Sequence, residues 1–199
     1  MSLRITGGQF KGLTLAVPRT IRATEAKVRQ ALFNIVGSAV EGARVLDGFA
    51  GSGALGLEAL SRGAAFAAFV DTDTEAVLSI RENLERLAHA LPRHCWRVMQ
   101  MELEPALRHL AGTEPPFDLL FLDPPYRSEE AKKALNAVVE YAKLQPSSIV
   151  AIEHEQRTAL PSSTGLWQLR TQHRYGDTVL SFYGLASRTH PAGASGTTG

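Results

Sequence analysis

Apolar residues follow two different spacings along this chain, and the two spacings alternate. Five short apolar runs have the length of buried β-strands; they cover residues 45–46, 64–70, 96–99, 117–122 and 149–152. Between these runs, apolar residues recur at intervals of three and four, which is typical of amphipathic helices; these segments are 53–62, 74–89, 103–111 and 128–143. Strands that alternate with helices predict an α/β fold, in which helices cover both faces of a parallel sheet.

The two ends of the chain depart from this alternation. Residues 3–17 predict a small β-hairpin, because apolar and polar positions alternate after a pair of glycines. Residues 25–39 predict a helix with one apolar face. Near the other end, the turn Tyr175-Gly176-Asp177 predicts an antiparallel hairpin made of residues 167–174 and 178–184.

Composition fits a globular protein of one domain. Of the 199 residues, 44% are hydrophobic and 21% are charged. Residues 187–199 are rich in Gly, Ser, Thr and Ala, which predicts a disordered tail after a single domain over residues 1–186. No apolar run approaches the roughly 18 residues that span a bilayer, and no signal peptide is visible, so we expect a cytoplasmic protein. Cys95 is the only cysteine and the histidines lack ligand spacing, so no metal site is expected.

The formal net charge is only +1, but the charges are unevenly distributed. Residues 1–40 contain six basic side chains and one acidic side chain, Glu25, whereas acidic groups outnumber basic groups in the rest of the chain. A basic N-terminal region on a mildly acidic body suggests an anionic partner such as nucleic acid at that end. The alternative is a solvated surface with a chance clustering of charge.

The strongest single motif is a glycine-rich loop between the first predicted strand of the sheet and the helix that follows it. Gly51, Gly53 and Gly56 satisfy G-x-G-x-x-G, and Asp71 ends the next strand, 20 residues after Gly51. This combination is the fingerprint of dinucleotide-binding folds, so a nicotinamide-dependent enzyme has to be considered.

Asp47 argues against a dinucleotide. It ends the first strand, four residues before Gly51, and a carboxylate there would repel a pyrophosphate but would favour the ammonium group of S-adenosylmethionine. We therefore expect S-adenosyl-L-methionine as cofactor, with Asp71 accepting hydrogen bonds from the ribose hydroxyls and Glu102 reaching the adenine amino group. A surface acid is an equal alternative for Glu102, and Asp73 is expected to be a helix N-cap or a surface acid. The expected cofactor-binding residues are Asp47, Phe49, Ala50, Gly51, Ser52, Gly53, Asp71, Glu102 and Asp123.

A second motif, Asp123-Pro124-Pro125-Tyr126, follows the fourth predicted strand of the sheet. The two prolines make a rigid loop without backbone donors, so the loop offers the Asp123 carboxylate, the Pro124 carbonyl and the Tyr126 ring. These groups suit the exocyclic amino group of a nucleobase: two acceptors can orient its N–H bonds, and the ring can stack on an extruded base. We therefore expect Asp123, Pro124, Pro125 and Tyr126 to be the catalytic residues.

Together these residues resemble the bacterial 16S rRNA guanine-N2 methyltransferases of the RsmD family. The resemblance runs from about Arg4 to Leu185 and includes the opening Arg4-Ile5-Thr6-Gly7-Gly8, the helix Val28-Arg29-Gln30-Ala31-Leu32-Phe33-Asn34, both motifs above and the hairpin Arg174-Tyr175-Gly176-Asp177-Thr178. Two positions depart from the usual family pattern: Ala23 replaces a proline, and Ala26-Lys27 replaces an acid-arginine pair.

The resemblance implies a Rossmann-like class I methyltransferase fold with a seven-stranded, mostly parallel sheet, a closing antiparallel hairpin, and a small N-terminal hairpin and helix. It also implies a monomer that methylates a guanine of 16S rRNA, within a partly assembled small subunit. The expected RNA-binding residues are Arg4, Lys11, Arg22, Lys27 and Arg29.

Two other functions remain open from the sequence alone. One is an amino-methyltransferase that acts on adenine N6 of DNA or RNA, or on a protein glutamine; these enzymes more often have Asn at the position of Asp123. The other is a non-enzymatic RNA-binding assembly factor, although the intact Asp47, Asp71 and Asp123 favour an enzyme.

Overall fold

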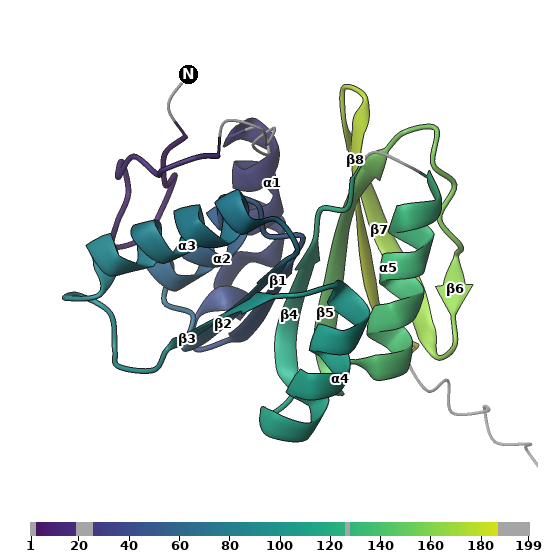
Figure 1. Cartoon of the computed structure of the whole chain (residues 1–199). Coiled ribbons are helices and arrows are strands. Elements are labelled where there is room, and N and C mark those ends of the chain that lie inside the picture. The colour runs from purple at the N-terminus through teal and green to yellow at the C-terminus, as the bar shows by residue number, and fades with distance from the viewer. Residues whose placement is uncertain (1–2, 19–25, 126–127, 187–199) are drawn as a thin grey trace, which may run out of the picture.

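The chain folds around one sheet, shown in Figure 1. The structure is a computed structural model that describes residues 3–18, 26–125 and 128–186. In this part of the chain the sheet has eight strands in the order β3-β2-β1-β4-β5-β8-β7-β6. Strands β1 to β5 pair in parallel, and β6 to β8 join antiparallel. The strands are β1 (Arg44–Gly48), β2 (Phe66–Asp71), β3 (Trp96–Gln100), β4 (Phe117–Leu122), β5 (Leu144–Glu155), β6 (Ser163–Thr164), β7 (Trp167–Tyr175) and β8 (Thr178–Leu185).

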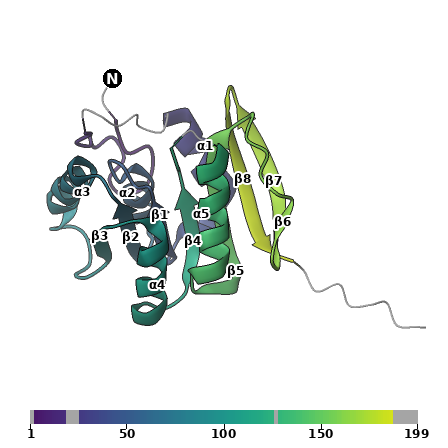
Figure 2. The same cartoon turned by 45° about the vertical axis from the view of Figure 1, so that its right-hand side comes forward.

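Helices cover both faces of the sheet, as Figures 1 and 2 show. Helices α1, α2 and α3 pack on one face, and α4 and α5 pack on the other. Asp73 caps the N-terminus of α3, because its Oδ1 accepts a 2.8 Å hydrogen bond from the backbone N–H of Ala76. The expected helix cap is thus confirmed. The helices are α1 (Ala26–Val36), which continues into the 3-10 helix η1 (Gly37–Val40), α2 (Ala54–Ser61), α3 (Thr74–Leu87), α4 (Leu103–Thr113) and α5 (Ser128–Tyr141).

The central strand β4 shows why residues 119–122 are continuously apolar. Leu120 and Leu122 face the helices α4 and α5, whereas Leu119 and Phe121 face α1 and α2. Phe121 meets Phe33 of α1 edge to face, with ring centroids 5.4 Å apart. Because both faces of the strand are buried from Leu119 to Leu122, polar residues are excluded from either side there. The half-buried Asp118, near the start of the strand, accepts the backbone N–H of Arg44 at 2.7 Å.

The predicted α/β fold with a closing antiparallel hairpin is confirmed, with two differences. The sheet has one strand more than the seven expected, because the two-residue strand β6 pairs with β7. The N-terminal hairpin is reduced to one bridge, between Arg4 and Thr14. Backbone hydrogen bonds still join its two arms, as between the N–H of Ile5 and the carbonyl of Leu13 at 3.0 Å. Its turn is also bonded to helix α2, since the backbone N–H of Gln9 donates to the carbonyl of Ser61 at 2.6 Å. Residues 3–17 are called the N-terminal segment below.

Candidate active site

The candidate site lies at the carboxyl ends of the parallel strands, where the strand order reverses. The chain leaves β1 toward β2 on one side, and β4 lies on the other side of β1. Ligands of open α/β sheets bind at this switch point. The glycine-rich loop follows β1, Asp71 ends β2 and Asp123 follows β4 directly. The two motifs of the sequence are therefore brought together by adjacent strands.

Backbone hydrogen bonds fix the glycine-rich loop in one shape. The N–H of Gly51 donates to Oδ2 of Asp71 at 2.7 Å, and the N–H of Gly53 donates to the carbonyl of Ala50 at 2.7 Å. Phe49 has a positive φ of 63°, a conformation that costs a non-glycine residue about 1–3 kcal/mol and that concentrates at functional sites. The loop is thus rigid and strained next to Asp71.

Asp47 lies beneath this loop. Its side chain is 1% exposed, and its Oδ2 accepts a 2.8 Å hydrogen bond from the backbone N–H of Gly56, in the first turn of α2. Gly56 itself has no room for a side chain, because a Cβ there would lie 2.3 Å from the ring of Phe69. Burial, together with the charges of Asp123 and Asp71, raises the pKa of Asp47 well above its usual value. Asp47 therefore holds the loop against α2 in a strongly acidic neighbourhood.

A cleft of about 790 Å³ opens beside the loop. Four of the expected site residues line it: Phe49, Asp71, Glu102 and Pro125. Val70, Met101 and Leu103 add an apolar lining from β2, from the segment after β3 and from the start of α4. Helix α5 contributes further lining residues that no sequence motif had selected, among them Ala134 and Ala137.

The loop after β4 begins against the end of β1. The backbone N–H of Asp123 donates to the carbonyl of Gly48 at 3.3 Å. Asp123 is half-buried, Pro124 is buried, and Pro125 is exposed where it lines the cleft. Tyr126 lies outside the described residues. Of the four predicted catalytic residues, the structure thus places Pro125 in the lining of the cleft and the backbone of Asp123 against Gly48, at the start of the glycine-rich loop.

The predicted RNA-binding residues fall into two groups. Arg4, Lys11 and Lys27 are exposed, and Arg22 lies outside the described residues. Arg29 is fully buried, and its Nε lies 3.4 Å from Oε2 of Glu58. Burial lowers the pKa of Arg29, which the adjacent Glu58 partly offsets. A side chain without exposed surface cannot contact RNA, so the expectation for Arg29 is wrong and its role is to hold α1 against α2.

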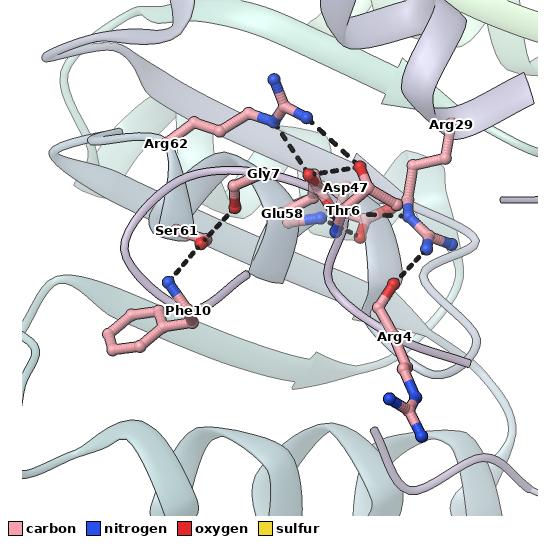
Figure 3. Close-up of polar contacts among 10 residues, drawn as sticks. Arg4, Thr6, Gly7, Phe10, Arg29, Asp47, Glu58, Ser61 and Arg62 are labelled. Atoms are coloured by element: carbon pink, nitrogen blue, oxygen red, sulfur yellow. Dashed lines mark hydrogen bonds and ion pairs between the residues drawn. The ribbon is translucent and has the colours of Figure 1, made fainter. Parts of the chain in front are cut away.

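Glu58 is the residue that the sequence reasoning missed. It is fully buried in α2, and Figure 3 shows its carboxylate between the side chains of Arg29, Arg62 and Thr6. A signal was present in the sequence, because Glu58 is the only charged residue of the apolar helix Ala54–Ser61. A buried charge of this kind requires partners, which here come from three separate stretches of the chain.

Among the residues that the structure describes, no group of three or more His, Cys, Asp or Glu side chains is arranged to hold a metal ion. None of their helices has the length and apolar character needed to cross a membrane.

Known proteins resemble this chain over nearly its whole length. Residues 3–184 match the family described as conserved hypothetical protein 95. "Putative rRNA methyltransferase YlbH" of Bacillus subtilis (strain 168) is 38% identical over 183 residues, which are 91% of this chain and 98% of that protein. "Ribosomal RNA small subunit methyltransferase D" of Escherichia coli (strain K12) is 33% identical over 183 residues, which are 91% and 89% of the two chains. The solved structure "Putative methyltransferase yhhF from Escherichia coli" has a TM-score of 0.80 at 32% identity, and covers 94% of this chain and 99% of its own.

Proposed function

This chain belongs to the RsmD family, the family described as conserved hypothetical protein 95, and from that premise we propose that it methylates the exocyclic N2 amino group of a guanine in 16S rRNA. The methyl donor is S-adenosylmethionine. The names of its relatives support an rRNA substrate, and the chemistry of its own site supports an amino group as the acceptor.

The observation that carries this proposal is the junction between the two motifs. The N–H of Asp123 is bonded to the carbonyl of Gly48, which directly precedes the glycine-rich loop. A group held by Asp123 and a group held by the loop are therefore neighbours. Catalysis by positioning needs this arrangement, because the reacting atoms have to be held close together and aligned.

The residues of the cleft fit S-adenosylmethionine better than a dinucleotide. The carboxylates of Asp71 and Glu102 line the cleft, and Asp123 lies at the start of the loop that reaches it. So acidic a site favours a sulfonium and an ammonium over a pyrophosphate. The loop from Phe49 to Gly53 would hold the amino-acid part, Asp71 would accept hydrogen bonds from the ribose hydroxyls, and Glu102 would face the adenine amino group. When bound, S-adenosylmethionine supplies an electrophilic methyl group.

The protein's own contribution to the chemistry is the orientation of a poor nucleophile. The lone pair of an exocyclic amino nitrogen is delocalised into the base. The Asp123 carboxylate and the Pro124 carbonyl would accept hydrogen bonds from the two N–H groups of this amino group. Such contacts favour a pyramidal nitrogen whose lone pair is aimed at the cleft. Tyr126 would stack on the extruded guanine with the face of its ring, an interaction worth about 1–3 kcal/mol.

A methyl-transfer assay with labelled S-adenosylmethionine tests this proposal. Purified protein is offered naked small-subunit rRNA, small-subunit particles and duplex DNA. We expect label in the rRNA or in the particle and none in DNA. Asp123→Ala should lower the rate on the order of 100-fold or more, because a positioning contact acts mainly in the transition state. Asp177→Ala, on the exposed hairpin turn, is the matched control and should leave the rate unchanged.

The outcomes separate the competing functions. Label in DNA or on adenine would move the chain to the adenine N6 enzymes, and binding of rRNA without methyl transfer would leave an assembly factor. Within the proposal, the protein acts as a cytoplasmic monomer. A preference for the particle over naked rRNA would indicate that it acts during small-subunit assembly.

A further inference from the structure

Two buried side chains connect the N-terminal segment to the elements that form the cofactor site. These are Glu58 of α2 and Asn83 of α3, both without exposed surface. We propose that Glu58 and Asn83 are positioning residues that couple RNA binding to cofactor binding. The coupling rests on the proposed function in one respect, namely that the N-terminal segment contacts RNA.

Asn83 makes the more direct connection. Its Oδ1 accepts the N–H of Ala16 at 2.7 Å, and its Nδ2 donates to the carbonyl of Ala16 at 3.0 Å. The same Nδ2 lies 3.2 Å from the carbonyl of Ser52, in the glycine-rich loop. One side-chain amide therefore binds the end of the N-terminal segment and the loop expected to hold the cofactor.

Glu58 makes the second connection, at the start of the N-terminal segment (Figure 3). Its Oε2 accepts the backbone N–H of Thr6 at 2.8 Å, and its Oε1 accepts the Thr6 hydroxyl at 2.7 Å. Arg62 Nε donates to the same Oε1 at 2.8 Å. Glu58 lies two residues after Gly56, whose N–H is bonded to Asp47. The segment is thus bonded to the helix that the glycine-rich loop opens.

The N-terminal segment also packs closely against the end of α2. The hydroxyl of Ser61 donates to the carbonyl of Gly7 at 2.7 Å and accepts the N–H of Phe10 at 2.9 Å. Segment, α2 and loop therefore move as one body. A cofactor that stabilises the loop should stabilise the segment as well, and by linkage RNA bound to the segment should strengthen cofactor binding by the same factor.

The test measures the factor by which a bound cofactor changes the affinity for RNA. The dissociation constant for naked small-subunit rRNA is determined with and without saturating S-adenosylhomocysteine, which cannot react. We expect the cofactor product to tighten RNA binding about 5-fold or more, the lower end of typical couplings. In Asn83→Ala and Glu58→Gln the factor should fall toward 1, while the affinity for S-adenosylhomocysteine without RNA changes less than about 3-fold. Glu85→Gln, exposed on α3 beside Asn83, is the matched control.

If Asn83 and Glu58 had a purely structural role, folded variants would keep the factor by which S-adenosylhomocysteine tightens RNA binding. Variants that keep the wild-type factor would therefore overturn the proposal, and so would a factor of 1 in the wild-type protein. Hydrogen exchange of the wild-type protein provides a second test that needs no RNA and no variant. Addition of S-adenosylhomocysteine should increase the protection of the Thr6, Gln9 and Ala16 amides. Unchanged protection also overturns the coupling, whereas failure of methyl transfer to rRNA would count against the proposed function instead.

Discussion

The carboxylate of Asp71 accepts the backbone N–H of Gly51 at 2.7 Å, so the end of β2 and the glycine-rich loop after β1 are joined by one short hydrogen bond. The other oxygen of Asp71 accepts the N–H of Asp73 at 2.9 Å. Asp71 also lines the cleft. A single side chain therefore shapes the loop and faces the space in which the cofactor is expected.

Asp71→Ala should weaken binding of S-adenosylhomocysteine by roughly 1–3 kcal/mol, because a charged acceptor is lost from the cleft and a loop contact is lost with it. Isothermal titration calorimetry measures the effect. Asp73→Ala removes the helix cap two residues away and should leave the affinity almost unchanged. Tighter binding of NAD than of S-adenosylhomocysteine by the wild-type protein would count against the cofactor itself.

Basic residues of the N-terminal region should bind RNA through its phosphates. The triple variant Lys11→Glu, Arg22→Glu, Lys27→Glu is expected to bind rRNA more weakly and with a flatter dependence on salt, since fewer counterions are released. Filter binding across a range of salt concentrations measures both quantities. A control triple of exposed residues elsewhere, Arg81→Glu, Arg93→Glu, Lys143→Glu, should have a smaller effect; equal effects would mean that only the overall charge matters.

Gly8 and Gly12 offer a matched pair for the packing of the N-terminal segment. Both have a positive φ, of 76° and 91°. A Cβ at Gly8 would lie 1.9 Å from the carbonyl oxygen of Ser61, whereas a Cβ at Gly12 would have no atom within 4 Å. Gly12→Ala should therefore lower the free energy of unfolding only by the backbone strain, about 1–2 kcal/mol. Gly8→Ala should lower it clearly more, because the added Cβ also clashes with Ser61. Urea unfolding measures both, and equal costs would show that the segment does not press on α2 in solution.

His154 should make the stability of the protein sensitive to mild acid. Its Nδ1 lies 2.9 Å from the carbonyl of Glu155 and therefore donates, so its Nε2 accepts from the hydroxyl of Ser181 at 2.7 Å. This arrangement needs the neutral ring, and burial lowers the pKa of His154 below the value of about 6.5 for an unfolded chain. The stabilisation is thus complete above that value and is lost as the pH falls toward the folded pKa.

Unfolding free energies at pH 7.5 and 5.5 measure this contribution. The wild-type protein should lose more stability between the two values than His154→Gln does. His109→Gln changes an exposed histidine and should behave like the wild type. If His154→Gln loses as much stability as the wild type, the histidine does not carry the pH dependence.

The hydrophobic pattern was sufficient for most of the fold, because each strand and helix of the α/β core buries a regular set of positions. Asp73 could also be interpreted locally, as a helix cap. The N-terminal hairpin was predicted too regular, because its turn is bonded to Ser61, which lies about 50 residues further along the chain.

The roles of the charged side chains were predicted less well, because they depend on which face of a helix is buried. A count of basic residues treats Arg29 and Lys27 alike, but the helix α1 turns Arg29 inward and Lys27 outward. The burial of Arg29 depends on Glu58, and their contact exists only after α1 packs on α2. The contribution of α5 to the cleft could not be predicted for the same reason, since it depends on how α4 and α5 pack beside each other on the sheet.

Mass spectrometry of nucleosides from rRNA methylated by the purified protein tests the central claim most directly. The account predicts N2-methylguanosine as the product, formed by the wild-type protein and nearly absent with Asp123→Ala, because Asp123 and Pro124 are proposed to orient an exocyclic amino group. N6-methyladenosine as the product, or N2-methylguanosine formed at the full rate by Asp123→Ala, would contradict it.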